Sequence, residues 1–167
     1  MADAGRPLRI GVLGTGALGR HHTRLASAHP DVDLIGIHDT CPEVAQSVAE
    51  EFSTRIFDDA ESLIEEIDAA VLAVPTVDHA TLGVELLRRG RHVMVEKPIA
   101  ASLREADELI EAAGDRVLAV GHVEFFNPAV TRLLREEGAP RFIDIDRLSV
   151  FTPRSLDIDV VLDLMIH

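Results

Sequence analysis

The sequence of 167 residues contains no tryptophan, no tyrosine and a single cysteine, Cys41. One cysteine excludes a disulfide framework and any zinc or iron–sulfur site that needs several cysteines. We therefore expect no metal centre and a reducing, cytoplasmic location. No apolar run reaches the roughly 18 residues that span a bilayer, and the N-terminus leads into a strand pattern instead of a signal peptide. We expect no membrane partner.

Basic residues are also scarce. The chain has 16 lysine and arginine residues against 29 aspartate and glutamate residues, which gives a net charge of −13. Nucleic-acid binding depends on a basic face that contacts the phosphate backbone, so we expect no nucleic-acid partner. Apolar residues make up 47% of the chain, the composition of a globular protein that can bury a core.

What the sequence does contain is a regular alternation of strand and helix patterns. Short apolar runs predict buried strands at residues 8–13, 32–38, 55–57, 69–74, 92–95 and 117–120. Amphipathic segments predict helices at residues 17–29, 42–52, 60–67, 78–89 and 102–113, the last of them capped by Ser102. This repeated alternation predicts a doubly wound parallel α/β domain over residues 1–122.

The pattern changes after Asn127-Pro128. We expect a helix to about residue 137, then a strand over 142–151 with the period-2 pattern of an antiparallel sheet, then a helix from about 156 to 167. Residues 123–167 are therefore interpreted as the N-terminal part of a second, α+β domain. Because 167 residues is generous for one domain and short for two, we expect this second domain to be truncated.

The segment Gly14-Thr15-Gly16-Ala17-Leu18-Gly19 follows the first strand and opens the first helix. In a G-x-G-x-x-G sequence the first glycine allows a tight turn and the second lets the backbone approach a pyrophosphate. The third lets the helix pack closely on the sheet. Free N–H groups at the helix start also attract phosphate. Asp39 stands 20 residues after Gly19, where a carboxylate accepts ribose hydroxyls and repels a 2′-phosphate. This pattern favours NAD over NADP, with an S-adenosylmethionine methyltransferase as an alternative.

Polar residues also follow three further expected strands, in the segments Val74-Pro75-Thr76, Glu96-Lys97-Pro98 and Gly121-His122. Ligands bind at the carboxyl ends of the strands in doubly wound sheets, so we expect these residues to line the cofactor cleft. His79 is expected in this crevice or on the surface of the next helix. His122 is expected in the cleft or bonded to a backbone carbonyl. His21 and His22 are adjacent and so are expected on an exposed and a packed helix face, not in a metal site.

Three of these segments together resemble the Gfo/Idh/MocA oxidoreductases, relatives of glucose–fructose oxidoreductase and inositol dehydrogenase. They are Gly14-x-Gly16-x-x-Gly19, Glu96-Lys97-Pro98 and Gly121-His122-Val123-Glu124-Phe125-Phe126-Asn127-Pro128. Asp163-Leu164-Met165-Ile166-His167 resembles the D-x-x-x-H sequence of the family. The segment at 121–128, followed by Phe151-Thr152-Pro153-Arg154, is similar to the branch that acts on nucleotide-linked amino sugars. That branch usually has arginine at the position of Phe125, which puts the charge of the substrate in question.

The resemblance implies a Rossmann-type nucleotide domain of a dehydrogenase that oxidises a sugar, nucleotide-sugar or cyclitol hydroxyl with NAD, and less readily with NADP. It places Lys97 beside the nicotinamide and the reacting carbon, His167 as the general base and Asp163 on the same helix face. It also implies a cis Lys97–Pro98 bond and, at full length, a homo-oligomer formed through the second domain. A regulatory protein of the same fold without turnover remains an alternative.

Overall fold

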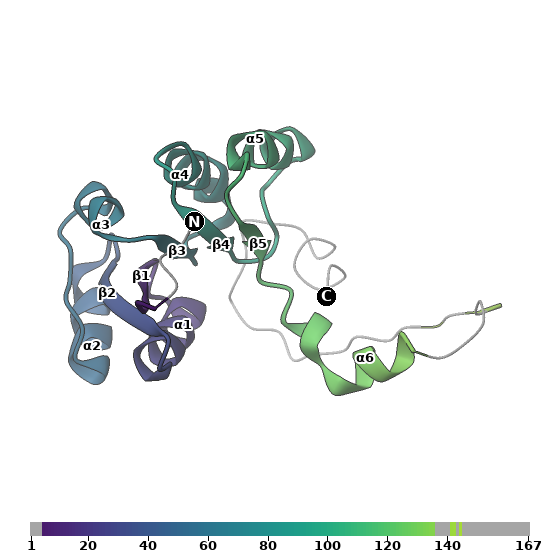
Figure 1. The fold of residues 1–167 in the computed structure, drawn as a ribbon, viewed down its shortest axis with the longest axis horizontal. Coiled ribbons are helices and arrows are strands. Elements are labelled where there is room, and N and C mark those ends of the chain that lie inside the picture. The colour runs from purple at the N-terminus through teal and green to yellow at the C-terminus, as the bar shows by residue number, and fades with distance from the viewer. Residues whose placement is uncertain (1–4, 136–140, 143, 145–167) are drawn as a thin grey trace.

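A parallel sheet of five strands, in the order β2-β1-β3-β4-β5, runs through the middle of the fold (Figure 1). The strands are β1 (Leu8–Leu13), β2 (Val32–His38), β3 (Ala69–Leu72), β4 (His92–Val95) and β5 (Leu118–Val120). The computed structural model describes residues 5–135, 141, 142 and 144. The strand order reverses between β1 and β3, which is the switch point at which doubly wound sheets bind ligands. The predicted fold class is confirmed.

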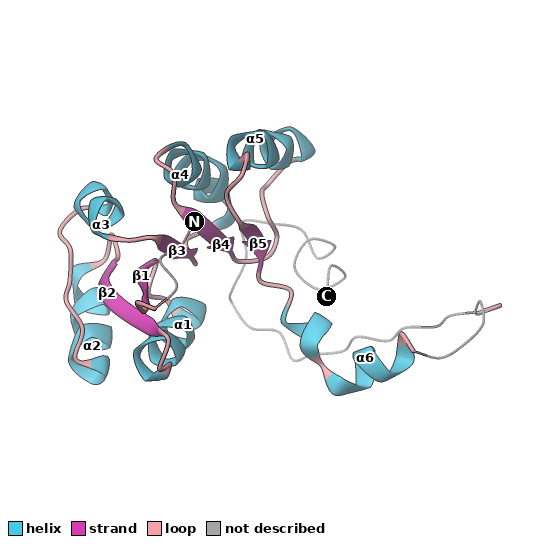
Figure 2. Cartoon of the chain, in the orientation of Figure 1, coloured by secondary structure: helices cyan, strands magenta, loops and turns pink. Residues whose placement is uncertain are grey.

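Helices follow the strands and cover both faces of the sheet (Figure 2). They are α1 (Ala17–Ala28), α2 (Pro42–Phe52), α3 (Ala60–Glu66), α4 (Thr76–Arg88) and α5 (Leu103–Ala113). In this view α1 and α2 lie below the sheet, and α3, α4 and α5 lie above it. Local sequence sets several helix starts. Asp59 accepts a hydrogen bond from the backbone N–H of Ser62, and Ser102 caps α5 as predicted by accepting one from Glu105.

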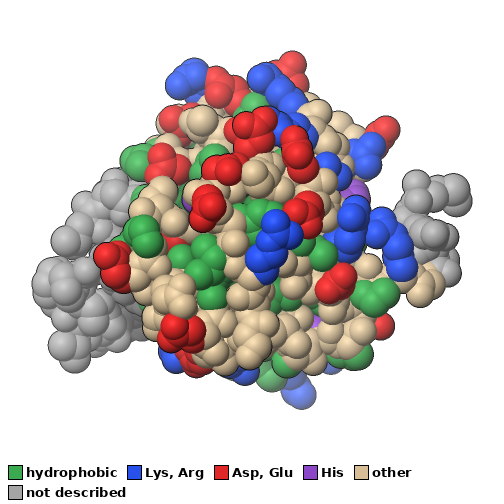
Figure 3. Space-filling model, turned by 90° about the vertical axis from the view of Figure 1, so that its left-hand side faces the viewer, with side chains coloured by type: hydrophobic (Ala, Val, Ile, Leu, Met, Phe, Trp, Pro, Cys, Tyr) green, Lys and Arg blue, Asp and Glu red, His purple; other side chains and the backbone are tan. Residues whose placement is uncertain are grey.

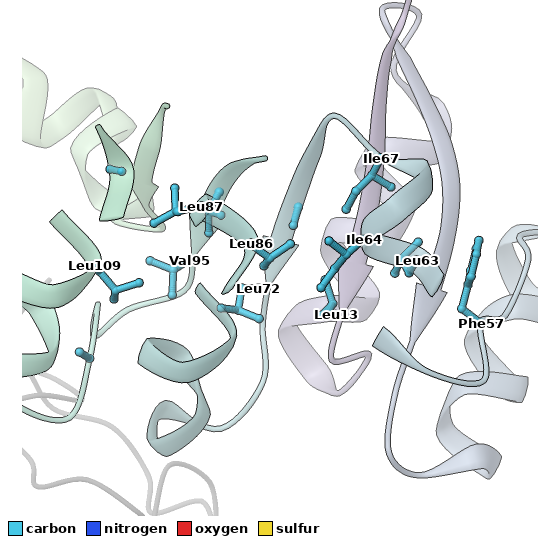
Figure 4. Close-up of a cluster of buried hydrophobic side chains, with 14 residues drawn as sticks. Leu13, Phe57, Leu63, Ile64, Ile67, Leu72, Leu86, Leu87, Val95 and Leu109 are labelled. Carbon is cyan, nitrogen blue, oxygen red and sulfur yellow. The ribbon is translucent and has the colours of Figure 1, made fainter. Parts of the chain in front are cut away.

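Two apolar cores hold the helices to the sheet. The larger core joins the sheet to α3, α4 and α5 (Figure 4), through fully buried side chains that include Ile64, Leu72, Leu86 and Leu109. Each such side chain contributes about 1.5–3 kcal/mol through burial. A smaller core joins the sheet to α2. Neighbouring residues of a strand point to opposite faces, so Val71 belongs to the smaller core and Leu72 to the larger.

The expected third strand at residues 55–57 is not part of the sheet. Only Ile56 forms a bridge, with Ile37 at the outer strand β2. Phe57 instead packs into the larger core, and the guanidinium of Arg55 lies 4.0 Å from the centre of its ring. Three residues beside an edge strand pair too briefly to form a strand. Two boundaries also shift: β3 ends at Leu72, and α4 begins at Thr76, directly after Pro75.

Residues after β5 follow a different course from the one predicted. Val123–Phe126 form a 3-10 helix, η1, and Pro128–Leu133 form α6, which ends earlier than the expected residue 137. Phe142 and Asp144 lie outside any strand, and the rest of the expected strand 142–151 falls outside the described residues, as does the expected helix 156–167. The domain boundary at residue 122 stays a prediction. In the described part of the chain, no helix has the length and apolarity needed to cross a membrane.

The face formed by α2 and α3 carries acidic and basic side chains side by side (Figure 3). Exposed ion pairs in this part of the fold include Arg55 with Glu66 at 3.0 Å and Arg20 of α1 with Glu51 of α2 at 2.6 Å. Exposed pairs of this kind contribute little to stability, because water screens the charges and the long side chains lose freedom. This face is therefore of mixed charge, with no continuous basic area.

A better-defined pairing lies at the amino end of the sheet, where Asp68 joins β1 to β3. Its carboxylate accepts hydrogen bonds from the Nη2, Nε and backbone N–H of Arg9, at 2.9, 3.3 and 3.2 Å, and from Arg6 at 3.1 Å. Hydrogen bonding by the Arg9 side chain, with smaller contributions from its backbone N–H and from Arg6, holds the pKa of Asp68 well below its usual range.

We expect Asp68→Asn to lower the free energy of unfolding by about 1 kcal/mol near neutral pH, because the charged acceptor of Arg9 is lost. A carboxylate with a lowered native pKa stabilises the fold above its ordinary pKa of about 4 and stops doing so as the pH falls through the native value. The difference between the two proteins therefore shrinks on acidification. Urea unfolding followed by circular dichroism measures it, and a difference that stays constant with pH contradicts the assignment.

Candidate functional site

The sequence-predicted site residues that the structure describes lie at one edge of the sheet. Because all five strands are parallel, their carboxyl ends meet there. Gly14 follows β1 and Asp39 follows β2, while the segments starting at Ala73, Glu96 and Gly121 follow β3, β4 and β5. Asp163 and His167, the other two catalytic candidates, lie outside the described residues. The described site is thus the nucleotide side of the predicted cleft.

The glycine turn between β1 and α1 is closely packed at two of its three glycines. Gly14 has φ +81°, and a Cβ there would lie 2.6 Å from the carbonyl oxygen of Ala73. A Cβ on Gly19 would overlap the carbonyl oxygen of Gly14. At Gly16 an added Cβ meets nothing within 4 Å. Gly14 and Gly19 are therefore required by the fold, whereas Gly16 borders open space.

The amino end of α1 begins at this open position. Gly16 is the N-cap residue and provides no side-chain hydrogen bond, so a ligand can bond to the first N–H groups of the helix. Ala17 and Leu18, in the first turn, are both exposed. A phosphate placed here would meet backbone donors and the positive end of the helix dipole.

Asp39 is held next to the glycine turn by three hydrogen bonds. Its Oδ2 accepts from the backbone N–H of Thr15 at 2.6 Å and from the Thr15 hydroxyl at 3.0 Å. Its Oδ1 accepts from the backbone N–H of Cys41 at 2.9 Å. The carboxylate is half-buried, and the Thr15 side chain is only 1% exposed. The two sequence features that predicted a nucleotide site, the turn and the acidic strand end, are thus in direct contact.

Glu96 does not face an open cleft, as the sequence suggested, but turns inward. Its Oε1 lies 2.6 Å from Nε2 of His22 on α1, and its Oε2 accepts a hydrogen bond from the backbone N–H of Lys97 at 3.1 Å. A Cβ on Gly121 would lie 2.9 Å from that same Oε2. Burial raises the pKa of Glu96, but the hydrogen bond and charge of His22, together with Lys97, outweigh it and lower the pKa overall. Glu96 therefore joins β4 to α1 and β5 as a carboxylate.

Sequence reasoning missed the part that His22 plays in this contact. His21 is exposed and His22 half-buried, so the expected division between an exposed and a packed face is confirmed. His22 lies three residues after Gly19 and hence on the same side of α1, which was the available signal. Its partner Glu96, 74 residues away, could not be identified from local pattern.

His79 is neither on the surface nor open to the cleft. Its side chain is 1% exposed, with Nδ1 at 2.9 Å from the carbonyl oxygen of Pro98 and Nε2 at 3.0 Å from that of Val74. Both ring nitrogens therefore face backbone carbonyl oxygens, and the predicted contact of His79 with a cofactor stays a prediction. A buried imidazole needs such partners, and here they connect the loops that follow β3 and β4.

The remaining predicted residues follow β3, β4 and β5 at the carboxyl edge of the sheet. Pro75 is exposed, Val74 is half-buried and Thr76 is buried at the start of α4. Lys97 and His122 are half-buried, directly after β4 and shortly after β5. The Lys97–Pro98 peptide bond is cis, as the resemblance predicts.

Phe125 occupies the place at which the resembling branch usually has arginine. The ring is 63% exposed and makes an edge-to-face contact with Phe126, with 5.3 Å between the ring centres. An apolar ring therefore replaces the expected cation on the surface of η1.

Comparison with known proteins decides the family. Residues 8–125 match the family model of the Gfo/Idh/MocA proteins, described as an oxidoreductase family with an NAD-binding Rossmann fold. The chain belongs to the Gfo/Idh/MocA oxidoreductase family. The match spans the glycine turn, Asp39 and the Glu96-Lys97-Pro98 segment, so the resemblance drawn from these motifs is confirmed.

Family relatives agree in both sequence and structure. UDP-N-acetylglucosamine 3-dehydrogenase of Acidithiobacillus ferrooxidans is 42% identical over 164 residues, which cover 96% of this chain and 51% of that protein. Its solved structure matches with a TM-score of 0.88 and 40% identity, covering 96% of this chain and 54% of that chain. Inositol 2-dehydrogenase of Acidothermus cellulolyticus is 30% identical over 175 residues, covering 97% of this chain and 51% of that protein.

A further solved structure bears on the cofactor. A protein from gentamicin A biosynthesis, in complex with NAD, matches with a TM-score of 0.73 and 28% identity, covering 78% of this chain and 39% of that chain. The chain spans about half the length of the curated relatives it matches. Neither the methyltransferase nor the regulatory alternative is supported by these Gfo/Idh/MocA relatives.

The glycine turn yields a matched pair of substitutions. We expect Gly19→Ala to lower the free energy of unfolding by about 1–3 kcal/mol, because its methyl group overlaps backbone that cannot move freely. Gly16→Ala adds the same methyl group into open space and should change stability by at most about 0.5 kcal/mol. Urea unfolding followed by circular dichroism compares the two. Equal losses of stability contradict the packing described for this turn.

Proposed function

We propose that this chain binds NAD(H) at the glycine turn and serves a dehydrogenase that oxidises a hydroxyl group of a sugar, nucleotide sugar or cyclitol. The observation that carries the proposal is the meeting of two features at one sheet edge, where Asp39 bonds directly to the turn and Lys97 follows β4. A dinucleotide needs the first feature for its phosphates and ribose. A cation beside the reacting hydroxyl stabilises the negative charge that develops during hydride transfer, a role that Lys97 would fill.

NAD is the preferred cofactor in this proposal. The Asp39 carboxylate lies beside the turn that would take the pyrophosphate, where it would bond to the adenosine ribose of a dinucleotide. A carboxylate accepts hydrogen bonds from ribose hydroxyls but repels the dianionic 2′-phosphate of NADP. The net charge of −13 does not oppose binding, because the phosphates would meet backbone N–H groups at the start of α1.

We expect the protein to bind NADH at least tenfold more tightly than NADPH, and Asp39→Ala to weaken NADH binding about tenfold, because a charged hydrogen-bond acceptor is lost. Asp39→Asn keeps the shape and removes the charge, so it should mainly improve NADPH binding. Nicotinamide fluorescence measures both affinities without interference from tryptophan, which the chain lacks. Asp33→Asn, which alters an exposed carboxylate on β2, the strand that Asp39 follows, is the control. Unchanged NADH affinity in Asp39→Ala contradicts the ribose assignment.

In the proposed mechanism the nicotinamide, when bound, accepts the hydride. The Lys97 ammonium would lie beside the substrate hydroxyl and stabilise the negative charge that develops on its oxygen. His167 would take the hydroxyl proton, since an imidazole titrates near neutral pH. Asp163, four residues earlier in the sequence, would bond to substrate or orient that imidazole. Thr76 and His122 would complete the cleft wall around this reaction.

Lys97 is also the only lysine in a sequence with fifteen arginines. Arginine serves equally well in exposed ion pairs, so general surface charge does not explain this lysine. A compact ammonium on a flexible stem suits a site where the cation must approach one oxygen atom.

We further propose a nucleotide-linked amino sugar as the substrate, because the chain is similar to UDP-N-acetylglucosamine 3-dehydrogenase. We also propose that the working form of the protein is a cytoplasmic homo-oligomer.

The single lysine allows a direct test of its place. Reductive methylation with isotope-labelled formaldehyde marks only Lys97 and the N-terminal amine, and we expect NADH to shift the NMR signal of Lys97. In an assay of NAD reduction with UDP-N-acetylglucosamine, Lys97→Ala should lower kcat about 100-fold and change NADH affinity by less than about threefold. A labelled Lys97 that does not respond to NADH, or a variant that keeps its turnover, contradicts the proposed role.

A further inference from the structure

The hydrogen bonds around Asp39 assign a specific task to the residue inside the glycine turn. We propose that Thr15 is a positioning residue for cofactor selectivity: its hydroxyl fixes the Asp39 carboxylate in the orientation that favours NAD over NADP. This inference rests on the proposed function and deepens it. It concerns a residue of the G-x-G-x-x-G segment whose side chain the motif itself leaves unspecified.

The geometry of the pair carries the proposal. Thr15 contributes two donors to the same carboxylate oxygen, its backbone N–H at 2.6 Å and its hydroxyl at 3.0 Å from Oδ2 of Asp39. The threonine side chain is 1% exposed, so water does not compete for the hydroxyl. The backbone bond would form with any residue at this position. Only the hydroxyl bond depends on threonine, and serine is the one other small residue that could supply it.

Counting acceptor sites shows what remains for a ligand. A carboxylate offers about four lone-pair sites, two on each oxygen. Thr15 occupies both sites on Oδ2, and the Cys41 N–H occupies one on Oδ1. The described residues therefore leave one site, on Oδ1, and in this arrangement Asp39 would accept one ribose hydroxyl and not two. The sequence had suggested that it could accept both.

Selectivity follows from the fixed position of the charge. A carboxylate held by both donors on Oδ2 cannot rotate away from an approaching 2′-phosphate. The repulsion between the two negative charges therefore weakens NADPH binding fully. Without the hydroxyl bond, the backbone N–H groups of Thr15 and Cys41 still bond to one oxygen each, but Oδ2 has lost one of its two donors and the carboxylate is held less rigidly. The carboxylate then avoids the 2′-phosphate more easily and presents Oδ1 less accurately to a ribose hydroxyl. Loss of the hydroxyl should thus weaken NADH binding and relieve the penalty on NADPH.

Two substitutions separate the hydroxyl from the shape of the side chain. Thr15→Val keeps the volume and removes the donor, and we expect the ratio of NADPH to NADH dissociation constants to fall about fivefold to tenfold. Thr15→Ser keeps the donor and removes the methyl group, and should retain most of the wild-type ratio. Thr23→Val is the matched control: Thr23, on α1, is also fully buried, and among the described residues its hydroxyl donates to the Gly19 carbonyl and not to Asp39. It should leave the ratio unchanged even if stability falls.

A double-mutant cycle with Asp39→Asn makes the coupling measurable. If Thr15 acts through the carboxylate, adding Thr15→Val to Asp39→Asn changes the ratio by less than about twofold. A valine effect of the same size in both backgrounds overturns the inference, as does a Thr15→Val protein with the wild-type ratio. A merely structural role would weaken both cofactors equally and leave the ratio constant, which also overturns it.

The NADPH and NADH affinities of Asp39→Ala and of the wild-type protein test the proposed function separately from the role of Thr15. If Asp39→Ala abolishes the NADH preference and Thr15→Val does not, the ribose assignment stands and the role of Thr15 fails. If the wild-type protein prefers NADPH, the proposed NAD preference fails, and the inference about Thr15 fails with it.

Discussion

The close approach of α1 to β1 is the constraint on which the rest of the site depends. Backbone contact at Gly14 and Gly19 leaves no room for a side chain, so the helix begins directly at the carboxyl edge of the sheet. That position has two consequences. It places Thr15 against Asp39 at the end of β2, and it places His22 against Glu96 at the end of β4. The turn between β1 and α1 therefore fixes a carboxylate on each side of itself.

These two carboxylates differ in burial and in hydrogen-bond partners. Asp39 is half-buried and keeps one acceptor site for a ligand, whereas Glu96 is buried and its charge is met by His22 and by the N–H of Lys97. Burying a charge without partners is costly, so these partners allow Glu96 to stay ionised. The buried carboxylate in turn orients the backbone at the position of the proposed catalytic lysine. The His79 ring lies between the carbonyl oxygens of Pro98 and Val74, at 2.9 and 3.0 Å, and so connects the loops that follow β4 and β3.

The described domain and the family assignment agree on a nucleotide-binding unit with a sheet edge prepared for a dinucleotide. Chemistry on a hydroxyl group requires more than this edge, since the proposed base His167 and its neighbour Asp163 come from the segment that follows it in the chain. In the proposed function, cofactor selection would therefore depend on the β1–α1 turn and the end of β2, whereas catalysis would need Lys97, after β4, together with residues near 167.

Much of this organisation was predictable because it is local. Strand and helix periods, the Ser102 cap and the glycine turn each involve residues within a few positions of one another, where side-chain size and hydrogen bonding act directly. The third strand was predicted wrongly, because pairing depends on a neighbour strand that local pattern does not supply. The sequence placed Glu96 in the cleft and His79 in the cleft or on a helix surface, yet Glu96 bonds to His22, 74 residues away, and His79 lies against Pro98, 19 residues away. The sequence by itself determined the fold class, the nucleotide turn and the family. Tertiary structure alone decided which polar side chains face a ligand and which are turned inward, because a buried polar group must bond to whatever donor or acceptor the packed chain brings beside it.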